Sequence, residues 1–207
     1  MAYFPFFIDI QDKHCLVVGG GAVALRKVTV LLQFGVYITV VAPRICKELK
    51  ELEKVESRII LLEREFMSTD ISQSFFVVAA TNNKVVNEAI SALCKQANTL
   101  VNVADSKESS SYLFPSIVKR GEVVVGTSTS GNSPDIAKWV KTSVEDAIPD
   151  YVAELAQSLG RYRTALKERI HSEGQRKEAF KELLYMGMKS QGKVTDDMLE
   201  EVIKHFQ

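Results

Sequence analysis

The sequence has few of the residues that hold metal ions or disulfide frameworks. Its 207 residues include three cysteines and three histidines. Cys15, Cys46 and Cys94 lie far apart, and none belongs to a C-x-x-C pair. A sparse, odd set of cysteines is typical of reduced thiols, so we expect a cytoplasmic protein without disulfides. The scattered histidines form no Cys/His cluster, and we therefore expect no resident metal ion.

The chain also lacks an excess of charge and a long apolar run. It has 26 basic and 26 acidic residues, and its formal net charge is zero. Proteins that bind nucleic acid or anionic lipid by bulk attraction are more basic, so we expect neither partner. No run approaches the ~18 apolar residues of a membrane-spanning helix. The apolar start contains Pro5 and Asp9 and no basic region, so we expect no signal peptide.

The first half of the chain alternates between apolar runs and helical patterns. Hydrophobic residues make up 46% of the chain and charged residues 25%, which is typical of a globular protein. Alternating strands and helices predict parallel crossovers and a doubly wound sheet. The expected strands cover residues 15–18, 37–42, 58–62, 75–80 and 99–103, and the expected helices cover 21–34, 45–55 and 84–96.

The pattern changes after residue 103. A hairpin is predicted at residues 113–126, with its turn at Arg120-Gly121, and helical spacing follows Pro134 to the end. Thr195 is the expected N-cap of the last helix. We therefore predict an α/β fold. It comprises a Rossmann-like parallel-sheet domain (1–112), a dimerisation hairpin and helix (113–149), and a small all-α C-terminal domain (150–207).

A glycine-rich loop directly follows the first predicted strand. Residues 19–24 (GGGAVA) match G-x-G-x-x-A and open a predicted helix. Gly19 permits the tight turn, and Gly21 lets the backbone approach a pyrophosphate at the helix start. Ala22 and Val23, the next backbone positions, are expected to contact the same group. Strand, loop and helix in this order predict a dinucleotide site rather than an unliganded turn.

The end of the second predicted strand leaves the choice of dinucleotide open. An NAD domain usually has an acid there, about 20 residues after the glycines, which binds the ribose 2′-hydroxyl. This sequence has Pro43 and Arg44 instead. Arg44 is compatible with a clamp for the 2′-phosphate of NADP, and equally with a residue that stacks on adenine.

Five stretches carry a resemblance to a known family. They are residues 15–27 (CLVVGGGAVALRK), 79–83 (AATNN), 101–105 (VNVAD), 114–117 (FPSI) and 130–134 (SGNSP). In this order they resemble the precorrin-2 dehydrogenases, which oxidise precorrin-2 to sirohydrochlorin and stand alone or form the N-terminal half of siroheme synthase. The resemblance implies an NAD-dependent enzyme of siroheme synthesis and an intertwined homodimer. The alternative within the family is a bifunctional enzyme that also inserts ferrous iron as a ferrochelatase.

The resemblance places the family's catalytic aspartate on Asp105, after the strand predicted at residues 99–103. Open α/β sheets build their sites at the carboxyl ends of strands. The oxidation needs a hydride to leave for the nicotinamide and a proton to leave for a base, and a carboxylate suits the second role. From the residues alone, the alternative is an aspartate that caps the polar loop.

Two further loops are expected to contribute binding residues. Thr81 and Asn82 end the fourth predicted strand and are expected to line the nicotinamide half of the cleft; the alternative is an N-cap of the next helix. The sequence 133–135 (SPD) predicts a capped helix start, whose N–H groups suit a substrate carboxylate. The expected substrate-binding residues are Ser128, Ser130, Asn132 and Ser133.

The tetrapyrrole that the resemblance implies carries many carboxylates, so a neutral protein must gather positive charge locally. The candidates near the site in sequence are Lys107, Lys119, Arg120, Lys138 and Lys141, each of which is equally compatible with solvated surface. Arg26 and Lys27, in the first predicted helix, are further candidates, with an exposed helix face as the alternative. His14 is expected to have a structural role.

The predicted hairpin is the expected dimer contact, because an isolated two-stranded hairpin is only marginally stable. Its apolar face comprises Ile117, Val118 and residues 123–125, and we expect the next helix to cover it through Trp139 and Val140.

A rival from another class is a non-catalytic NAD-sensing module, like the regulatory domains of potassium transporters. Such a module usually keeps the acid after its second strand and has no use for the VNVAD and SGNSP stretches. We therefore expect an enzyme.

Overall fold

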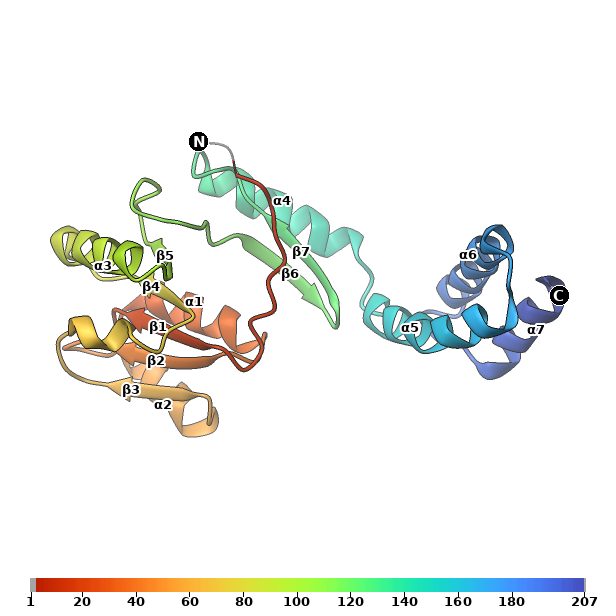
Figure 1. The fold of residues 1–207 in the computed structure, drawn as a ribbon, viewed down its shortest axis with the longest axis horizontal. Helices are drawn as coiled ribbons and strands as arrows, with labels where there is room; N and C mark the ends of the chain where they lie inside the picture. The colour runs from red at the N-terminus through yellow and green to blue at the C-terminus, as the bar shows by residue number, and fades with distance from the viewer. Residues whose placement is uncertain (1–2, 207) are drawn as a thin grey trace. The chain divides into compact units, whose positions relative to one another are not determined.

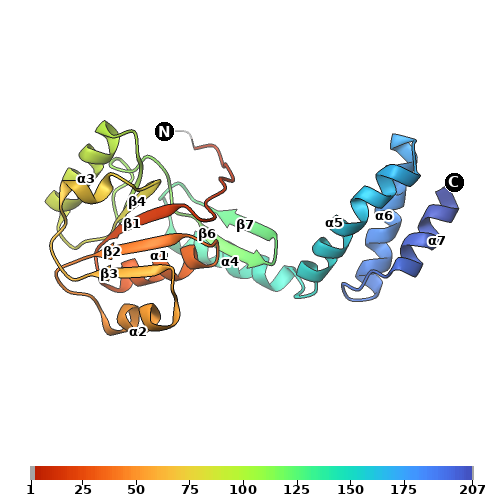
Figure 2. The same cartoon turned by 60° about the horizontal axis from the view of Figure 1, so that its bottom comes forward.

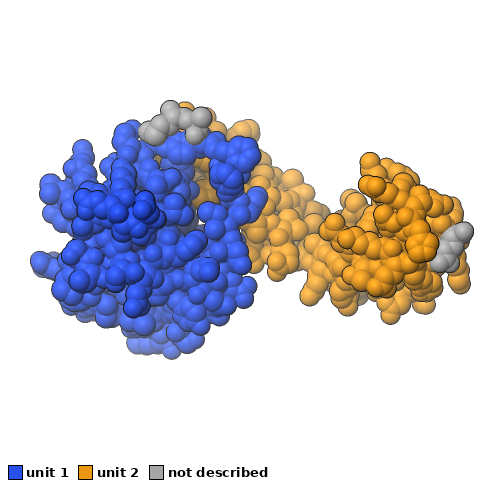
Figure 3. Space-filling model, viewed as in Figure 1, with its two compact units in different colours: residues 1–114 blue, residues 115–207 orange. Residues whose placement is uncertain are grey.

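The structure is a computed structural model that describes residues 3–206. Contacts divide the chain into two compact units, Met1–Phe114 and Pro115–Gln207 (Figure 3). Unit 1 contains β1 (His14–Val18), α1 (Ala22–Leu32), β2 (Tyr37–Val41), α2 (Lys47–Val55), β3 (Ile59–Leu62), the 3-10 helix η1 (Ser68–Ile71), β4 (Phe76–Ala79), α3 (Lys84–Gln96) and β5 (Leu100–Val103) (Figure 1).

The five strands of unit 1 form one parallel sheet in the order β3-β2-β1-β4-β5 (Figure 2). Val18, at the end of β1, pairs with Val41 of β2 on one side and Ala79 of β4 on the other. The chain therefore adds β2 and β3 on one side of β1 and then crosses to the other side, where it adds β4 and β5. This arrangement confirms the predicted α/β fold and puts a topological switch point between the carboxyl ends of β1 and β4.

The central strands β1 and β4 form because nearly all of their residues are buried on both faces of the sheet. Cys15 and Val17 pack into the core under α1 and α2, whereas Leu16 and Val18 pack against α3 and η1. Parallel strands that are covered on both sides show continuous apolar runs rather than alternation. Each fully buried Val or Leu contributes about 1.5–3 kcal/mol, so the central strands anchor the unit.

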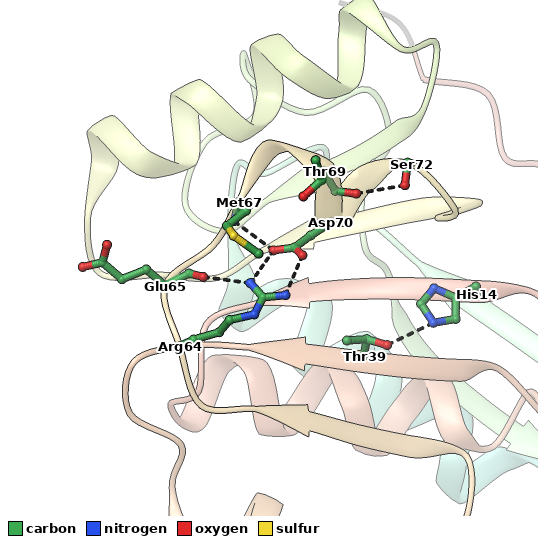
Figure 4. A network of polar contacts seen from close by, with 8 residues as sticks. All are labelled: His14, Thr39, Arg64, Glu65, Met67, Thr69, Asp70 and Ser72. Carbon is green, nitrogen blue, oxygen red and sulfur yellow. Dashed lines mark hydrogen bonds and ion pairs between the residues drawn. The ribbon is translucent and has the colours of Figure 1, made fainter.

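The ion pair between Arg64 and Asp70 holds the segment between β3 and β4 (Figure 4). Arg64 donates from Nη2 to Oδ1 of Asp70 at 2.7 Å and from Nη1 to Oδ2 at 2.9 Å. The same Oδ2 accepts the backbone N–H of Met67 at 2.9 Å. These hydrogen bonds hold the pKa of the Asp70 carboxyl below its usual value, with Arg64 as the main cause. The sequence patterns did not predict η1, which this pair stabilises.

Unit 2 begins with an antiparallel hairpin and continues as helices. Its elements are β6 (Ser116–Arg120), β7 (Val123–Thr127), α4 (Pro134–Ala147), α5 (Val152–Arg169), α6 (Glu173–Lys189) and α7 (Asp196–Phe206). Residues of α5, α6 and α7 share a core that includes Leu155, Leu183 and Val202. Thr195 precedes α7, and its hydroxyl accepts the N–H of Met198 at 3.4 Å, as predicted. The expected boundary between residues 149 and 150 stays a prediction.

Helix α4 packs against both strands of the hairpin, but not through the expected tryptophan. Trp139 is 69% exposed, so the expectation that it covers the hairpin is wrong for this unit. Ala137 is buried and Val140 is half-buried, which defines the covered face. Trp139 follows Ala137 by two positions, which places it on a different side of a 3.6-residue helix.

Among residues 3–206, no helix is both long enough and apolar enough to cross a membrane. The three cysteines are free thiols, of which Cys15 and Cys94 are buried.

The Arg64–Asp70 pair gives a prediction about stability. Asp70→Asn keeps the shape and removes the charge, and it should lower the free energy of unfolding by about 1 kcal/mol, because Arg64 remains partly exposed. Since folding lowers the pKa of Asp70, its contribution is present above the unfolded pKa and is lost as the pH falls through the folded pKa.

Urea denaturation at neutral and acidic pH measures both effects. The exposed pair of Lys54 with Glu51 provides the control, and Glu51→Gln should leave the urea midpoint unchanged. An unchanged midpoint for Asp70→Asn at neutral pH would contradict the assignment.

Candidate functional site

The glycine loop is packed directly against the end of β4. Gly19 has φ +128°, and a Cβ built on it would lie 2.3 Å from the carbonyl oxygen of Ala80. Its N–H donates to the carbonyl of Val41 at 2.9 Å. Only glycine combines this backbone conformation with so close an approach. The loop after β1 therefore touches the ends of both neighbouring strands.

Gly20 makes a second close contact, which the sequence analysis did not predict. A Cβ at Gly20 would lie 2.3 Å from the carbonyl oxygen of Arg44. The Gly20 carbonyl accepts the N–H of Cys46 at 2.8 Å. The predicted cofactor residues Pro43 and Arg44, both exposed, are thereby brought next to the glycine loop.

Gly21 differs from its two neighbours because it faces open space. No heavy atom lies within 4 Å of a Cβ built there. Gly21 is the N-cap of α1, no side chain caps this helix, and its first turn has no acid. Unsatisfied N–H groups and the positive end of the helix dipole favour an anion. The residues present, with exposed Ala22 and half-buried Val23, therefore fit a dinucleotide pyrophosphate.

The segment after β4 is held by a residue that the sequence analysis missed. The Thr81 hydroxyl donates to Oδ1 of Asn87 at 2.7 Å, and Nδ2 of Asn87 donates to the Thr81 carbonyl at 3.1 Å. Asn87 is buried in α3, three and seven positions before buried Ile90 and Cys94. The sequence signal that could have identified Asn87 is its position, because a polar residue stands there at the helical spacing of buried apolar residues. Asn82 is exposed at the same turn.

The alternative role of Thr81 or Asn82 as the helix cap is wrong. The N-cap of α3 is Asn83, whose Oδ1 accepts the N–H groups of Val85 and Val86 at 3.0 and 3.3 Å. Thr81 and Asn82 thus lie at the switch point without capping α3.

Asp105 lies in the turn after β5 and is exposed, with φ +60°. The loop around it is held by serines, because the Ser110 hydroxyl donates to the Ser106 carbonyl at 2.7 Å and the Ser106 N–H donates to Val103 at 3.3 Å. Within residues 3–206, no hydrogen bond to the Asp105 carboxylate maintains this loop. A proton-accepting role for Asp105 stays a prediction.

Lys27 is half-buried, so the alternative in which it lies on an exposed face is wrong. Its Nζ donates to Oδ1 of Asn102 at 2.7 Å and lies 4.1 Å from the centre of the Phe114 ring. Burial lowers the pKa of Lys27 to about 8, Arg26 lowers it further, and Asp105 acts in the opposite direction. Lys27 lies three positions after buried Ala24, and residues three apart share a face of a helix. This spacing could have predicted that Lys27 lies on the covered face of α1.

The expected substrate residues lie in unit 2, in the loop between β7 and α4. The Ser133 hydroxyl accepts the N–H of Ile136 at 3.3 Å and caps α4. The Ser128 hydroxyl accepts the N–H of Ser130 at 3.1 Å, and Asn132 is exposed. Substrate binding by these four residues stays a prediction.

Two of the candidate basic residues already have acidic partners in unit 2. Arg120 lies 3.3 Å from Asp150, and Lys141 lies 3.1 Å from Glu145.

Together, the sheet order, the close-packed glycine loop and the uncapped start of α1 define a dinucleotide-binding protein of the Rossmann class. A family model described as "Putative NAD(P)-binding" matches residues 6–116, and the chain belongs to this family. This match confirms the dinucleotide cofactor that the glycine loop predicts.

Curated relatives and a solved structure extend the similarity beyond this domain. The chain is 36% identical over 188 residues to a siroheme synthase of Vesicomyosocius okutanii, covering 91% of this chain and 40% of the relative. It is 37% identical over 187 residues to a siroheme synthase of Nitrosospira multiformis, covering 89% and 40%. The chain thus spans about two fifths of the length of these relatives.

The solved structure is "SirC, precorrin-2 dehydrogenase", with a TM-score of 0.69 and 27% identity, covering 99% of this chain and 98% of that chain. These similarities confirm the family resemblance that the five stretches predict.

Gly21 provides a test of the dinucleotide site. Gly21→Asp puts a side chain and a negative charge into the open space at the start of α1, so NAD affinity should fall at least roughly tenfold, or about 1.4 kcal/mol. The thermal midpoint should not fall, because no protein atom is near and Asp is a favourable N-cap residue. Calorimetric titration with NAD and thermal melting measure the two quantities.

Gly160→Asp is the matched control, since Gly160 also has no heavy atom within 4 Å of its position for Cβ. It should bind NAD like the wild type. Wild-type NAD affinity in Gly21→Asp would remove the assignment of the pyrophosphate to this loop.

Proposed function

We propose that this chain oxidises precorrin-2 to sirohydrochlorin in the cytoplasm, as a step of siroheme synthesis. The observation that carries the proposal is the similarity to a precorrin-2 dehydrogenase over 99% of this chain and 98% of that one. The membership in the NAD(P)-binding family and the siroheme synthase relatives support it. When bound, NAD supplies the acceptor for the hydride.

In this proposal the residues at the switch point bind and orient the dinucleotide. The N–H groups at Gly21, Ala22 and Val23 receive the pyrophosphate, because the start of α1 has no other cap. Pro43 and Arg44 flank the adenosine half, since their loop contacts Gly20.

Thr81 and Asn82 belong to the nicotinamide half. The Asn87 amide accepts the backbone N–H of Thr81 and donates to its carbonyl, so this part of the site is held in place before the cofactor arrives. Gly19 holds the turn against the same segment.

Asp105 takes the proton that leaves the tetrapyrrole. Its carboxylate is exposed at the carboxyl rim of the sheet and is not used to hold its own loop, so an oxygen lone pair is available to substrate. Ser128, Ser130, Asn132 and Ser133 supply hydroxyl, amide and backbone donors to the substrate carboxylates.

Anaerobic incubation with precorrin-2 and either NAD or NADP tests the proposal. We expect sirohydrochlorin, with the higher kcat/KM for NAD, as the resemblance implies and despite Arg44. NAD binding without oxidation would instead support the dinucleotide-sensing module. A parallel incubation with ferrous iron tests the bifunctional alternative, since siroheme formed faster than the uncatalysed rate adds iron insertion to the activity.

The variant Asp105→Ala tests the proton acceptor. Removing a general base slows a reaction by about 10²–10⁴-fold, so kcat should fall by this factor. The NAD dissociation constant and the thermal midpoint should stay close to wild type, because the carboxylate is exposed and does not maintain the loop.

Glu108→Ala is the matched control, as it removes another exposed carboxylate from the same loop and should leave kcat unchanged. An Asp105→Ala enzyme with more than half of the wild-type kcat would end the assignment. Proton transfer would then go directly to water.

We further propose that the chain is a homodimer through the hairpin β6–β7 and α4. The hairpin has only two strands, and α4 leaves Trp139 69% and Ile136 54% exposed. Unpaired strand edges and exposed apolar side chains favour a second copy as partner.

Light scattering at micromolar concentration should give the dimer mass for the wild type, and Trp139→Glu should shift it towards the monomer. The neighbouring Lys138→Glu, also exposed, controls for the added charge. A monodisperse wild-type monomer would contradict the dimer.

A further inference from the structure

Lys27 joins three of the segments that carry the family resemblance. It lies in α1, its ammonium donates to Asn102 in β5, and it lies against the ring of Phe114. Asn102 in turn donates from Nδ2 to the carbonyl of Tyr112 at 3.1 Å. The first helix, the last strand and residues 112–114 of unit 1 are therefore held together at one ammonium group.

We propose that Lys27 is a positioning residue of the dehydrogenation: its ammonium fixes Asn102, three residues before Asp105, and directs positive charge towards the Asp105 carboxylate. This inference rests on the proposed function, in which Asp105 receives the proton. Lys27 acts through Asp105 and has no contact with the reacting atoms in this scheme.

The fold itself does not require a charge at this position. Residues on the same face of α1, such as Ala24 and Leu31, are small or apolar. Within residues 3–206, no carboxylate lies within ion-pair distance of the Lys27 ammonium, whose hydrogen-bond partner is a neutral amide. Placing a cation there costs free energy, because buried charges are normally paired. An apolar side chain of similar length would avoid this cost.

The position of Asp105 depends on the strand that Lys27 holds. Asp105 has φ +60° in the turn directly after β5, and its loop returns to β5 through the Ser110 hydroxyl, which accepts the N–H of Val103 at 2.9 Å. Movement at Asn102 would thus be transmitted to the carboxylate within three residues.

The charge of Lys27 also faces a defined set of titratable groups. They are Arg26 on its own helix, Cys15 on β1 and Asp105 after β5. Burial raises the pKa of the Cys15 thiol well above its usual value, so the thiol is neutral near pH 8. Asp105 is therefore the anion that the ammonium attracts.

The pKa of Lys27, about 8, gives this role a pH signature. Below that pH the ammonium attracts both the Phe114 ring and the Asp105 carboxylate. Above it, the neutral amine keeps a hydrogen bond to Asn102 but loses both attractions. The wild-type kcat should therefore decline as the pH rises through about 8.

The experiment compares Lys27→Met and Lys27→Arg with the wild type in anaerobic turnover of precorrin-2 and NAD, across neutral to alkaline pH. Met retains length without charge, and we expect at least a tenfold lower kcat with an NAD dissociation constant within twofold of wild type. Arg stays charged across this range. We therefore expect it to retain more activity than Met and to abolish the decline near pH 8.

Lys13→Met is the matched control. Lys13 is exposed and also lies over an aromatic ring, 5.7 Å from the centre of Phe75. Its removal should change neither kcat nor the pH profile. Thermal melting of every variant separates loss of folded protein from loss of kcat per folded molecule.

The outcomes separate the two proposals. If the wild type turns over and Lys27→Met retains its kcat and pH profile, the positioning role is overturned and the proposed function stands. The positioning role is also overturned if Lys27→Met loses only folded protein and Lys27→Arg keeps the alkaline decline. A folded wild type that binds NAD but does not oxidise precorrin-2 overturns both.

Discussion

The pairing of β1 with β4 is the constraint on which the rest of unit 1 depends. It places the end of β1 beside the end of β4, so that the carbonyl of Ala80 leaves no space for a side chain at Gly19. The same approach fixes the turn from which α1 starts and the direction of its first N–H groups. The dinucleotide site is thus a consequence of strand order, and its glycines follow from backbone packing as much as from the ligand.

A chain with no net charge attracts anionic ligands only through local arrangements. In unit 1 the start of α1 is such an arrangement, whereas Lys27 acts on a carboxylate of the protein itself, Asp105. The start of α1 offers backbone dipoles that need no ionisable group, so its attraction for a phosphate does not change with pH. Lys27 offers a full charge in a partly dry setting, which acts strongly at short range and depends on protonation.

The order of strands and helices was predictable because the apolar patterns of unit 1 are long and regular. The helix expected at residues 84–96 is α3 in full, and the five strands lie within a residue or two of their expected ends. Side-chain environments were less predictable. The sequence left an exposed face open for Lys27, whose helix position is half-buried, and Asn83 rather than its neighbours caps α3. The role of Asp105 depends on a substrate, which no local pattern encodes.

In the proposed oxidation, the glycine loop has a consequence for the exchange of cofactor between turnovers. Gly19 and Gly20 are already seated against the backbones of Ala80 and Arg44, and Asn87 already clamps Thr81. Ordering a flexible residue costs about 1–2 kcal/mol, and this site avoids that cost when a dinucleotide enters. Reduced cofactor can likewise depart without the loop unfolding. In the proposed reaction, the oxidised and reduced forms would therefore exchange at a loop that is already packed, without a rearrangement of this loop.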